Sequence, residues 1–131
     1  AGRTTKVGFL LDSALDRLAD AAFPAALAIA AARTSSAADG TLAALAVGAT
    51  AACWFLEYVR ARANLAAPEE RGHQVITPGE RPTRIILTAV GLALPALAFV
   101  ALWGHVAIVG ASALFLLAHS TVRLHRLDHG D

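Results

Sequence analysis

Long apolar segments with almost no charged side chains leave few possible folds for this chain. The clearest runs from Thr41 to Val59, where Glu57 is the only charged residue. Another extends from Val7 to Ala32, and its length of about 26 residues exceeds the roughly 20 that a helix needs to cross a bilayer. Hydrophobic residues make up 56% of the chain and charged residues 16%, which is unusual for a soluble domain. The sequence therefore predicts an all-α, integral membrane helical bundle.

We expect a single transmembrane domain over residues 1–131, with four transmembrane helices. These helices are expected at about 7–32, 41–62, 82–103 and 106–123. A polar cytoplasmic loop rich in proline and charge is expected at 66–82, and a tight turn at Gly104 and His105. In that turn His105 is expected to be an interface residue.

Basic residues predict the orientation of the bundle. Nine of them belong to one end of such a bundle: Arg3, Lys6, Arg60, Arg62, Arg71, Arg81, Arg84, Arg123 and Arg126. Arg33 alone falls at the opposite end. The positive-inside rule makes the crowded end cytoplasmic, which predicts a multi-pass protein of a bacterial inner or plasma membrane. No basic patch of the kind that binds nucleic acid is present.

Three carboxylates recur every four residues in the first apolar segment, at Asp12, Asp16 and Asp20. Residues four apart share one face of a helix, so they form an acidic stripe. Charged groups inside a membrane helix are costly, which favours a functional role. Carboxylates suit a hard divalent cation, and nearby arginines suit phosphate groups. The alternative is a structural stripe that pairs with Arg17 and neighbouring arginines, and Asp20 in particular is expected to support Arg17 or packing.

Three stretches resemble the CDP-alcohol phosphatidyltransferase family. Gly8-x3-Asp12-x3-Asp16 resembles the second half of its signature, D-x2-D-G-x2-A-R-x8-G-x3-D-x3-D. The further matches are Asp16-Arg17-Leu-Ala-Asp20 with D-R-x2-D, Tyr58-Val-Arg60-Ala-Arg62-Ala with the end of the next helix, and Glu80-Arg81-Pro82-Thr83-Arg84 with E-R-P-x-R. The stretches follow one another in the family's order and cover most of the chain.

The resemblance implies a homodimeric membrane enzyme with six transmembrane helices, of which this chain holds four. Its reaction transfers a phosphatidyl group from CDP-diacylglycerol to an alcohol and releases CMP. By the same resemblance, Asp12 and Asp16 are ligands of Mg²⁺ or Mn²⁺, with two ions in a complete site. Asp16 is also the expected general base, and Gly8 lets the CDP moiety approach closely.

Arginines near the predicted cytoplasmic end indicate the acceptor. Arg62 and Arg84, followed by Arg60 and Arg81, match positions where family members bind an acceptor phosphate. A polyol phosphate, such as inositol phosphate or glycerol phosphate, is the expected acceptor. The alternative is orientation of the chain and contact with anionic membrane lipid. Asn64 replaces a glutamate that bacterial relatives often carry, so the particular polyol stays open.

The first half of the signature, D-x2-D-G-x2-A-R, is absent from the sequence. We therefore expect the chain as given to be inactive. Two other functions stay open. Membrane prenyltransferases also bind Mg²⁺-diphosphate through D-x3-D stripes, although they account for neither Gly8 nor the E-R-P-x-R match. The other alternative is a non-catalytic bundle or fragment.

Overall fold

The computed structural model describes residues 5–67 and 75–129, and every regular element in these ranges is helical. The elements in chain order are α1 (Lys6–Ala32), α2 (Asp39–Ala66), α3 (Arg81–Ala93), the short 3-10 helix η2 (Pro95–Leu97) and α4 (Ala98–His129). The predicted all-α class is confirmed. Arg3 and Arg71, which contributed to the predicted topology, lie outside the described residues.

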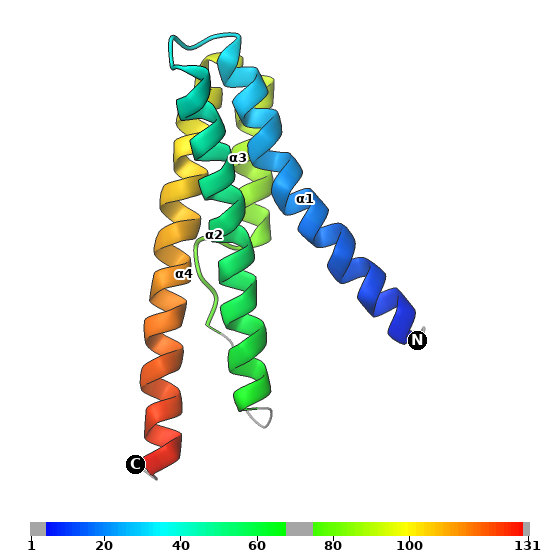
Figure 1. The fold of residues 1–131 in the computed structure, drawn as a ribbon, viewed down its shortest axis with the longest axis vertical. Coiled ribbons are helices and arrows are strands. Elements are labelled where there is room, and N and C mark those ends of the chain that lie inside the picture. The colour runs from blue at the N-terminus through cyan, green and yellow to red at the C-terminus, as the bar shows by residue number, and fades with distance from the viewer. Residues whose placement is uncertain (1–4, 68–74, 130–131) are drawn as a thin grey trace.

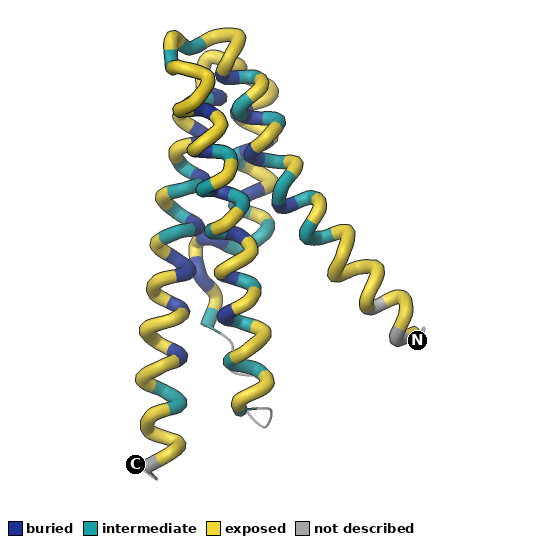
Figure 2. The backbone as a smooth tube through the Cα atoms, in the orientation of Figure 1, coloured by how far each residue is buried: buried dark blue, intermediate teal, exposed yellow. Residues whose placement is uncertain are grey.

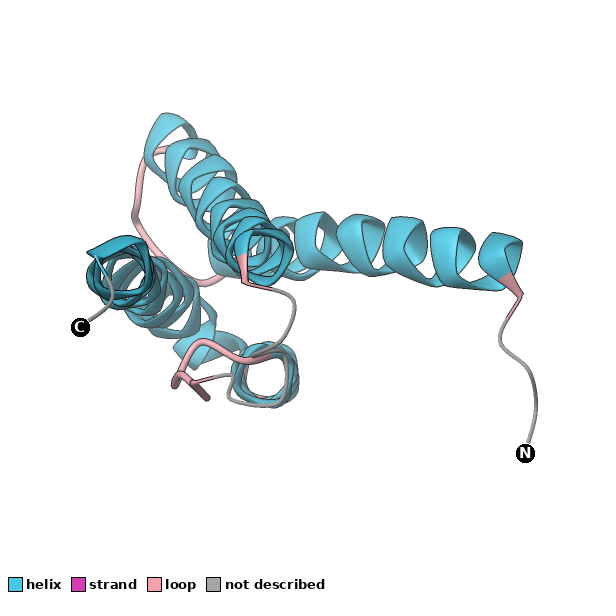
Figure 3. Ribbon diagram, turned by 90° about the horizontal axis from the view of Figure 1, so that it is seen from below, coloured by secondary structure: helices cyan, strands magenta, loops and turns pink. Residues whose placement is uncertain are grey.

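The helices form an elongated bundle in which neighbours along the chain are antiparallel (Figure 1). The long helices α2 and α4 pack against each other over much of their length, and both end at the bottom of the view. The turns that follow α1 and α3 meet at the opposite end. Only the second half of α1 lies in the bundle, because its first half diverges from the other helices, as Figure 3 also shows.

Local sequence explains where α1 and α3 begin and end. The side chain of Thr5 caps α1 by accepting a hydrogen bond from the amide of Gly8 at 3.0 Å. At the other end of the bundle, Leu94 adopts φ −123° and ψ 81° directly before Pro95. The ring of a proline clashes with the residue before it and disfavours the helical conformation of that residue, so α3 ends there. The Thr34 hydroxyl donates to the Pro95 carbonyl at 2.9 Å and joins the two turns.

The prediction of a turn at Gly104 and His105 is wrong. The chain reverses at Leu94–Leu97 instead, and α4 continues without a break from Ala98 to His129. His105 is therefore not an interface residue of a turn but a fully buried side chain inside α4. The physical reason is that proline, which lacks an amide hydrogen, ends a helix more strongly than glycine does.

Two clusters of apolar side chains form the core. One joins α1, α2 and α4 near the turns, and its residues are Leu27, Ala31, Leu42, Leu45, Ala98, Ala101 and Leu102. The other lies between α2 and α4 further along the bundle, and its residues are Cys53, Leu56, Val59, Val109, Ala113 and Leu116. Cys53 is buried in this second cluster with a free thiol. The first half of α1 joins neither cluster and is largely exposed (Figure 2).

A non-helical stretch, residues 75–80, leads into α3 between α2 and α4. The amide of Gly79 donates to Ser112 Oγ of α4 at 2.8 Å. A β-carbon at Gly79 would lie 2.8 Å from the side chain of Ser112 and 3.1 Å from the backbone of Val109. Only glycine lets the chain pass this close to α4, so the residue is required for the entry of the stretch into the bundle.

Two helical segments are long and apolar enough to cross a membrane, namely Asp39–Ala66 and Pro95–Asp128. This test concerns length and composition alone. Two membrane-spanning helices are therefore supported by length and composition, whereas the sequence predicts four. α3 has 13 residues and a length of about 20 Å, whereas the hydrocarbon core of a bilayer is about 30 Å thick.

Candidate functional site

The acidic stripe of α1 runs from solvent into the bundle. Asp12 lies on the diverging half of the helix and is exposed, Asp16 is half-buried, and Asp20 is only 1% exposed. The three carboxylates share a helix face but occupy different environments. A charged group is more costly to bury than to leave in water, so Asp20 requires a charged partner.

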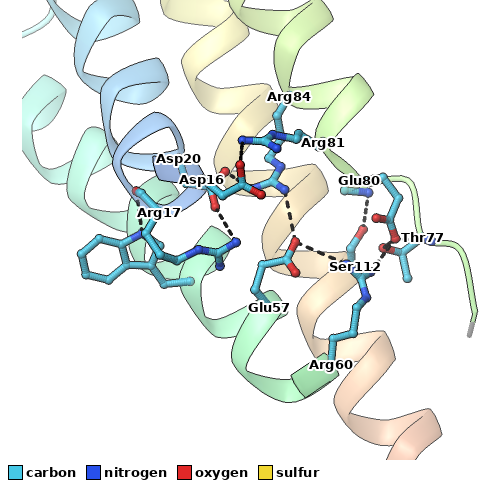
Figure 4. Close-up of polar contacts among 12 residues, drawn as sticks. Asp16, Arg17, Asp20, Glu57, Arg60, Thr77, Glu80, Arg81, Arg84 and Ser112 are labelled. Carbon is cyan, nitrogen blue, oxygen red and sulfur yellow. Dashed lines mark hydrogen bonds and ion pairs between the residues drawn. The ribbon is translucent and has the colours of Figure 1, made fainter. Parts of the chain in front are cut away.

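That partner is Arg84 of α3 (Figure 4). Its Nη1 lies 2.5 Å from Asp20 Oδ1, and its side chain is 2% exposed. Arg84 Nη2 also contacts Glu57 Oε1 of α2 at 3.3 Å. A single buried guanidinium thus joins α1, α2 and α3. The Arg17 side chain, at the edge of the bundle, adds a longer contact of 3.4 Å to Asp20 Oδ2.

The segment that resembles E-R-P-x-R forms the start of α3, and each of its charged side chains contacts another helix. Arg81 forms an ion pair with Asp16, one turn before the pair of Arg84 and Asp20. Glu80 accepts a hydrogen bond from Arg60 of α2 at 2.5 Å. Pro82 sits in the first turn, where its missing amide hydrogen costs nothing. The segment therefore attaches α3 to both α1 and α2.

Glu80 also orders the chain that leads into α3. Its Oε1 accepts from the amide and hydroxyl of Thr77 at 3.1 and 3.2 Å. Arg60 is shared between Glu80 and Glu57, whose Oε1 it contacts at 3.3 Å. Acidic and basic groups alternate through this network, so each buried or half-buried charge has a partner of opposite sign.

A groove of about 530 Å³ lies beside this network, between α1 and α2. The residues that line it are Asp12, Ser13, Asp16, Arg17, Trp54, Glu57, Tyr58 and Ala61. Trp54 Nε1 donates to the Arg17 carbonyl at 3.3 Å and helps to hold the two helices together. The groove therefore presents carboxylates that can accept a proton and a guanidinium that can bind an anion.

The expected metal ligands Asp12 and Asp16 face this groove together, but they do not fit a divalent cation by themselves. Within the described residues, no three His, Cys, Asp or Glu side chains converge in a way that could hold a metal ion. Mg²⁺ favours near-octahedral oxygen coordination, so two carboxylates supply only part of the donors. In addition, Asp16 already pairs with Arg81.

The four arginines expected at an acceptor phosphate lie in different places. Arg81 is near the groove through its contact with Asp16, whereas Arg84 and Arg60 bind carboxylates inside the bundle. Arg62 lies outside this groove, with its guanidinium 6.0 Å from the centre of the Tyr58 ring. Gly8 lies on the exposed half of α1, one turn before Asp12.

Sequence reasoning missed the part played by Glu57. The sequence identified it only as the single charged residue of an apolar segment, yet it contacts both Arg60 and Arg84 and lines the groove. Its isolation in a long apolar segment was the available sign, because a lone charge in such a segment needs a partner. The contact of Asp20 with Arg17 agrees with the expectation, but the stronger contact with Arg84 was not foreseen.

No protein-family model, curated protein or solved structure that was compared with this chain matches it. The resemblance to CDP-alcohol phosphatidyltransferases therefore depends on the motif residues themselves.

Proposed function

We propose that this chain is part of a membrane enzyme that transfers a phosphatidyl group from CDP-diacylglycerol to an alcohol, with release of CMP. The observation that supports the proposal best is the shared groove of Asp12, Asp16 and Arg17, together with the Arg81 contact to Asp16. In this arrangement a carboxylate can take a proton from a hydroxyl while guanidinium groups bind phosphate oxygens.

Membrane placement is supported by the side chains on the outside of the bundle. More large apolar side chains are exposed than buried, and examples such as Leu10, Ile86 and Leu114 are each more than 60% exposed. Contact with lipid tails instead of water removes the cost of that exposure. We propose that all four helices lie in the bilayer, with the stretch 75–80 and α3 together forming the third crossing.

In the proposed reaction Asp16 is the general base that deprotonates the acceptor hydroxyl. The oxygen of that hydroxyl then attacks the phosphorus of the phosphatidyl group, and the bond to CMP breaks. Arg17 and Arg81 hold the anionic substrate groups, and Arg81 is the best placed of the four expected acceptor arginines. Mg²⁺ or Mn²⁺ would supply further neutralisation of phosphate charge. Such a cation would need more oxygen ligands than Asp12 and Asp16 provide, and the proposal includes these further ligands.

A polyol phosphate is the proposed acceptor, because the guanidinium of Arg81 lies near the groove in addition to that of Arg17 and suits a second phosphate group. The arginines also neutralise carboxylates, however, and Arg84 in particular already contacts Asp20 and Glu57 through its two terminal nitrogens. We therefore assign acceptor binding to Arg81 and the positioning of α3 to Arg84. A homodimer is likewise part of the proposal.

The test uses membranes that contain the whole product of the gene carrying this sequence. CMP release from CDP-diacylglycerol is measured with glycerol phosphate or inositol phosphate as acceptor. Asp12→Asn and Asp16→Asn are expected to lower the rate at least 100-fold. Asp39→Asn is the matched control, since Asp39 is an exposed carboxylate in the first turn of α2, and it should keep the wild-type rate.

Three outcomes would contradict the proposal or a part of it. Release of pyrophosphate from a prenyl diphosphate, without CMP release, would identify a membrane prenyltransferase. Near-normal CMP release by Asp16→Asn would remove the acidic stripe from the chemistry. A non-catalytic bundle would show neither activity while remaining folded in the membrane.

A further inference from the structure

A second groove, separate from the carboxylates, lies between the last turns of α2 and α4. Its volume is about 530 Å³. Most of its lining comes from apolar and aromatic side chains, and its polar contributors are Arg62, Ser120 and Thr121. Among the described residues, Tyr58 alone lines both this groove and the groove of Asp12 and Asp16. The two grooves are therefore distinct hollows that adjoin at Tyr58.

The strongly polar side chains of the lining are concentrated toward the helix ends. Phe55, Val59 and Leu117 lie further from the ends of α2 and α4 than Arg62 and Thr121, and Leu65, Ala66 and Leu124 add apolar contacts beside the polar side chains. Seven residues separate Phe55 from Arg62, which corresponds to about 10 Å along a helix. Such a gradient suits a molecule with an apolar chain and a polar head at one end.

The polar end of the groove is positively charged. Arg62 is exposed, and its guanidinium lies above the ring of Tyr58, which holds it at the groove. An adjoining hollow shares Ala63, Ser120 and Leu124 with the groove and adds Asn64 and Arg123. No acidic side chain is among the described residues that line either hollow. The charge is therefore complementary to an anion.

We infer that this groove binds one anionic phospholipid, with an acyl chain along Phe55 and Leu117 and the headgroup phosphate at Arg62. The helix ends that carry the groove are rich in arginine, as expected for a face that meets anionic headgroups. The inference depends on the proposed membrane placement but not on the transferase activity. The lipid occupies a site of its own and is not the reacting substrate at Asp16.

The experiment is native mass spectrometry of the purified full chain, released from detergent after titration with lipid. The two probes are dioleoylphosphatidylglycerol and dioleoylphosphatidylcholine, which have the same acyl chains. One phosphatidylglycerol molecule is expected to be retained with about fivefold preference over phosphatidylcholine, the contribution of one arginine near a headgroup. Lipid retention is measured without any substrate. A negative result would therefore contradict the lipid site and leave the proposed transferase activity untouched.

Two variants locate the site. Arg62→Gln should reduce the preference to less than twofold. Arg33→Gln changes another exposed arginine, at the opposite end of the bundle, and should leave the preference unchanged. Leu117→Trp fills the apolar part and should weaken retention of both lipids. Elution volume and helix content confirm that each variant is folded.

Three results would overturn the inference. The first is equal retention of the two lipids by the wild-type chain. The second is an Arg62→Gln preference equal to that of Arg33→Gln. The third is displacement of phosphatidylglycerol by millimolar glycerol phosphate, which would identify a site for soluble phosphates in place of a lipid.

Discussion

Arg84 Nη1 lies 2.5 Å from Asp20 Oδ1, although 64 positions separate the two residues in the chain. Both side chains are at most 2% exposed, so neither charge is stabilised by solvent. Arg84 Nε and Asp20 Oδ2 have no hydrogen-bond partner among the described residues, which leaves the pair incompletely satisfied. A buried pair of this kind is costly to break and contributes little net stability while it is intact.

Arg84→Met should lower the free energy of unfolding by about 3–5 kcal/mol, because it leaves the buried carboxylate of Asp20 without its main partner. The double change Arg84→Met with Asp20→Leu should cost less than either single change, since no uncompensated charge remains. Both changes in the free energy of unfolding are measured by denaturation in detergent, monitored by circular dichroism. Arg17→Gln is the control, with an expected cost below about 1 kcal/mol because its side chain is partly exposed. A double variant less stable than both single variants would contradict this account.

Exchange of the charges at Asp16 and Arg81 separates structure from chemistry. Asp16→Arg combined with Arg81→Asp keeps an ion pair between α1 and α3, so stability should stay within about 1 kcal/mol of the wild type. CMP release by the whole gene product should nevertheless fall at least 100-fold, as for Asp16→Asn, because the carboxylate leaves α1. Activity that survives the exchange would reduce Asp16 to a structural residue.

Gly91→Ala should destabilise the bundle by about 1–3 kcal/mol. A β-carbon at Gly91 would lie 2.4 Å from Leu27 Cδ2 and 2.9 Å from Ala101 Cβ, in the core where α1, α3 and α4 meet. Gly48→Ala is the matched control, because among the described residues no atom outside its chain neighbours and the adjacent backbone of α2 lies within 4 Å of a β-carbon placed there. It should stabilise α2 by about 0.5–1 kcal/mol through the loss of backbone freedom in the unfolded chain. Thermal midpoints that shift in the same direction for both variants would argue against close packing at Gly91.

His105→Leu should leave stability unchanged or raise it. The ring is fully buried, and neither nitrogen has a hydrogen-bond partner within the described residues, although the Ala101 carbonyl one turn earlier lies close to it. An unsatisfied buried polar group costs about 1–3 kcal/mol, and leucine removes that cost at similar volume. His119→Leu, at an exposed position stacked on Phe115, is the control with little expected effect. A loss of more than about 2 kcal/mol on His105→Leu would show that the imidazole has a partner after all.

Apolar length was sufficient to predict the helical class, but not the position of every turn. The segment from Thr83 to Val122 is almost continuously apolar and contains two candidate breaks, Pro95 and Gly104. A crossing of about 20 residues favours the later break. The structure uses Pro95 because the chain has already entered the bundle as the stretch 75–80, so that a helix of 13 residues reaches the far end.

The pairing of charges was only partly predictable. Pairing of the aspartate stripe with arginines was only the alternative to a metal site in the sequence analysis, yet Asp16 and Asp20 both contact arginines of α3. Which arginine meets which aspartate depends on how far α3 slides along α1, and sequence spacing does not determine that register. Glu57 illustrates the same limit, because its two partners, Arg60 and Arg84, come from its own helix and from α3.

The start of α3 lies partway along the bundle and not at one of its ends, because the stretch 75–80 occupies the distance below it (Figure 1). The amino end of a helix carries about half a unit of positive charge from its aligned peptide dipoles. In this chain that partial charge is placed among the side chains of Asp16, Asp20 and Glu57, which contact the first turn of α3. The backbone itself thus helps to stabilise these carboxylates, and this contribution persists when an individual arginine is replaced.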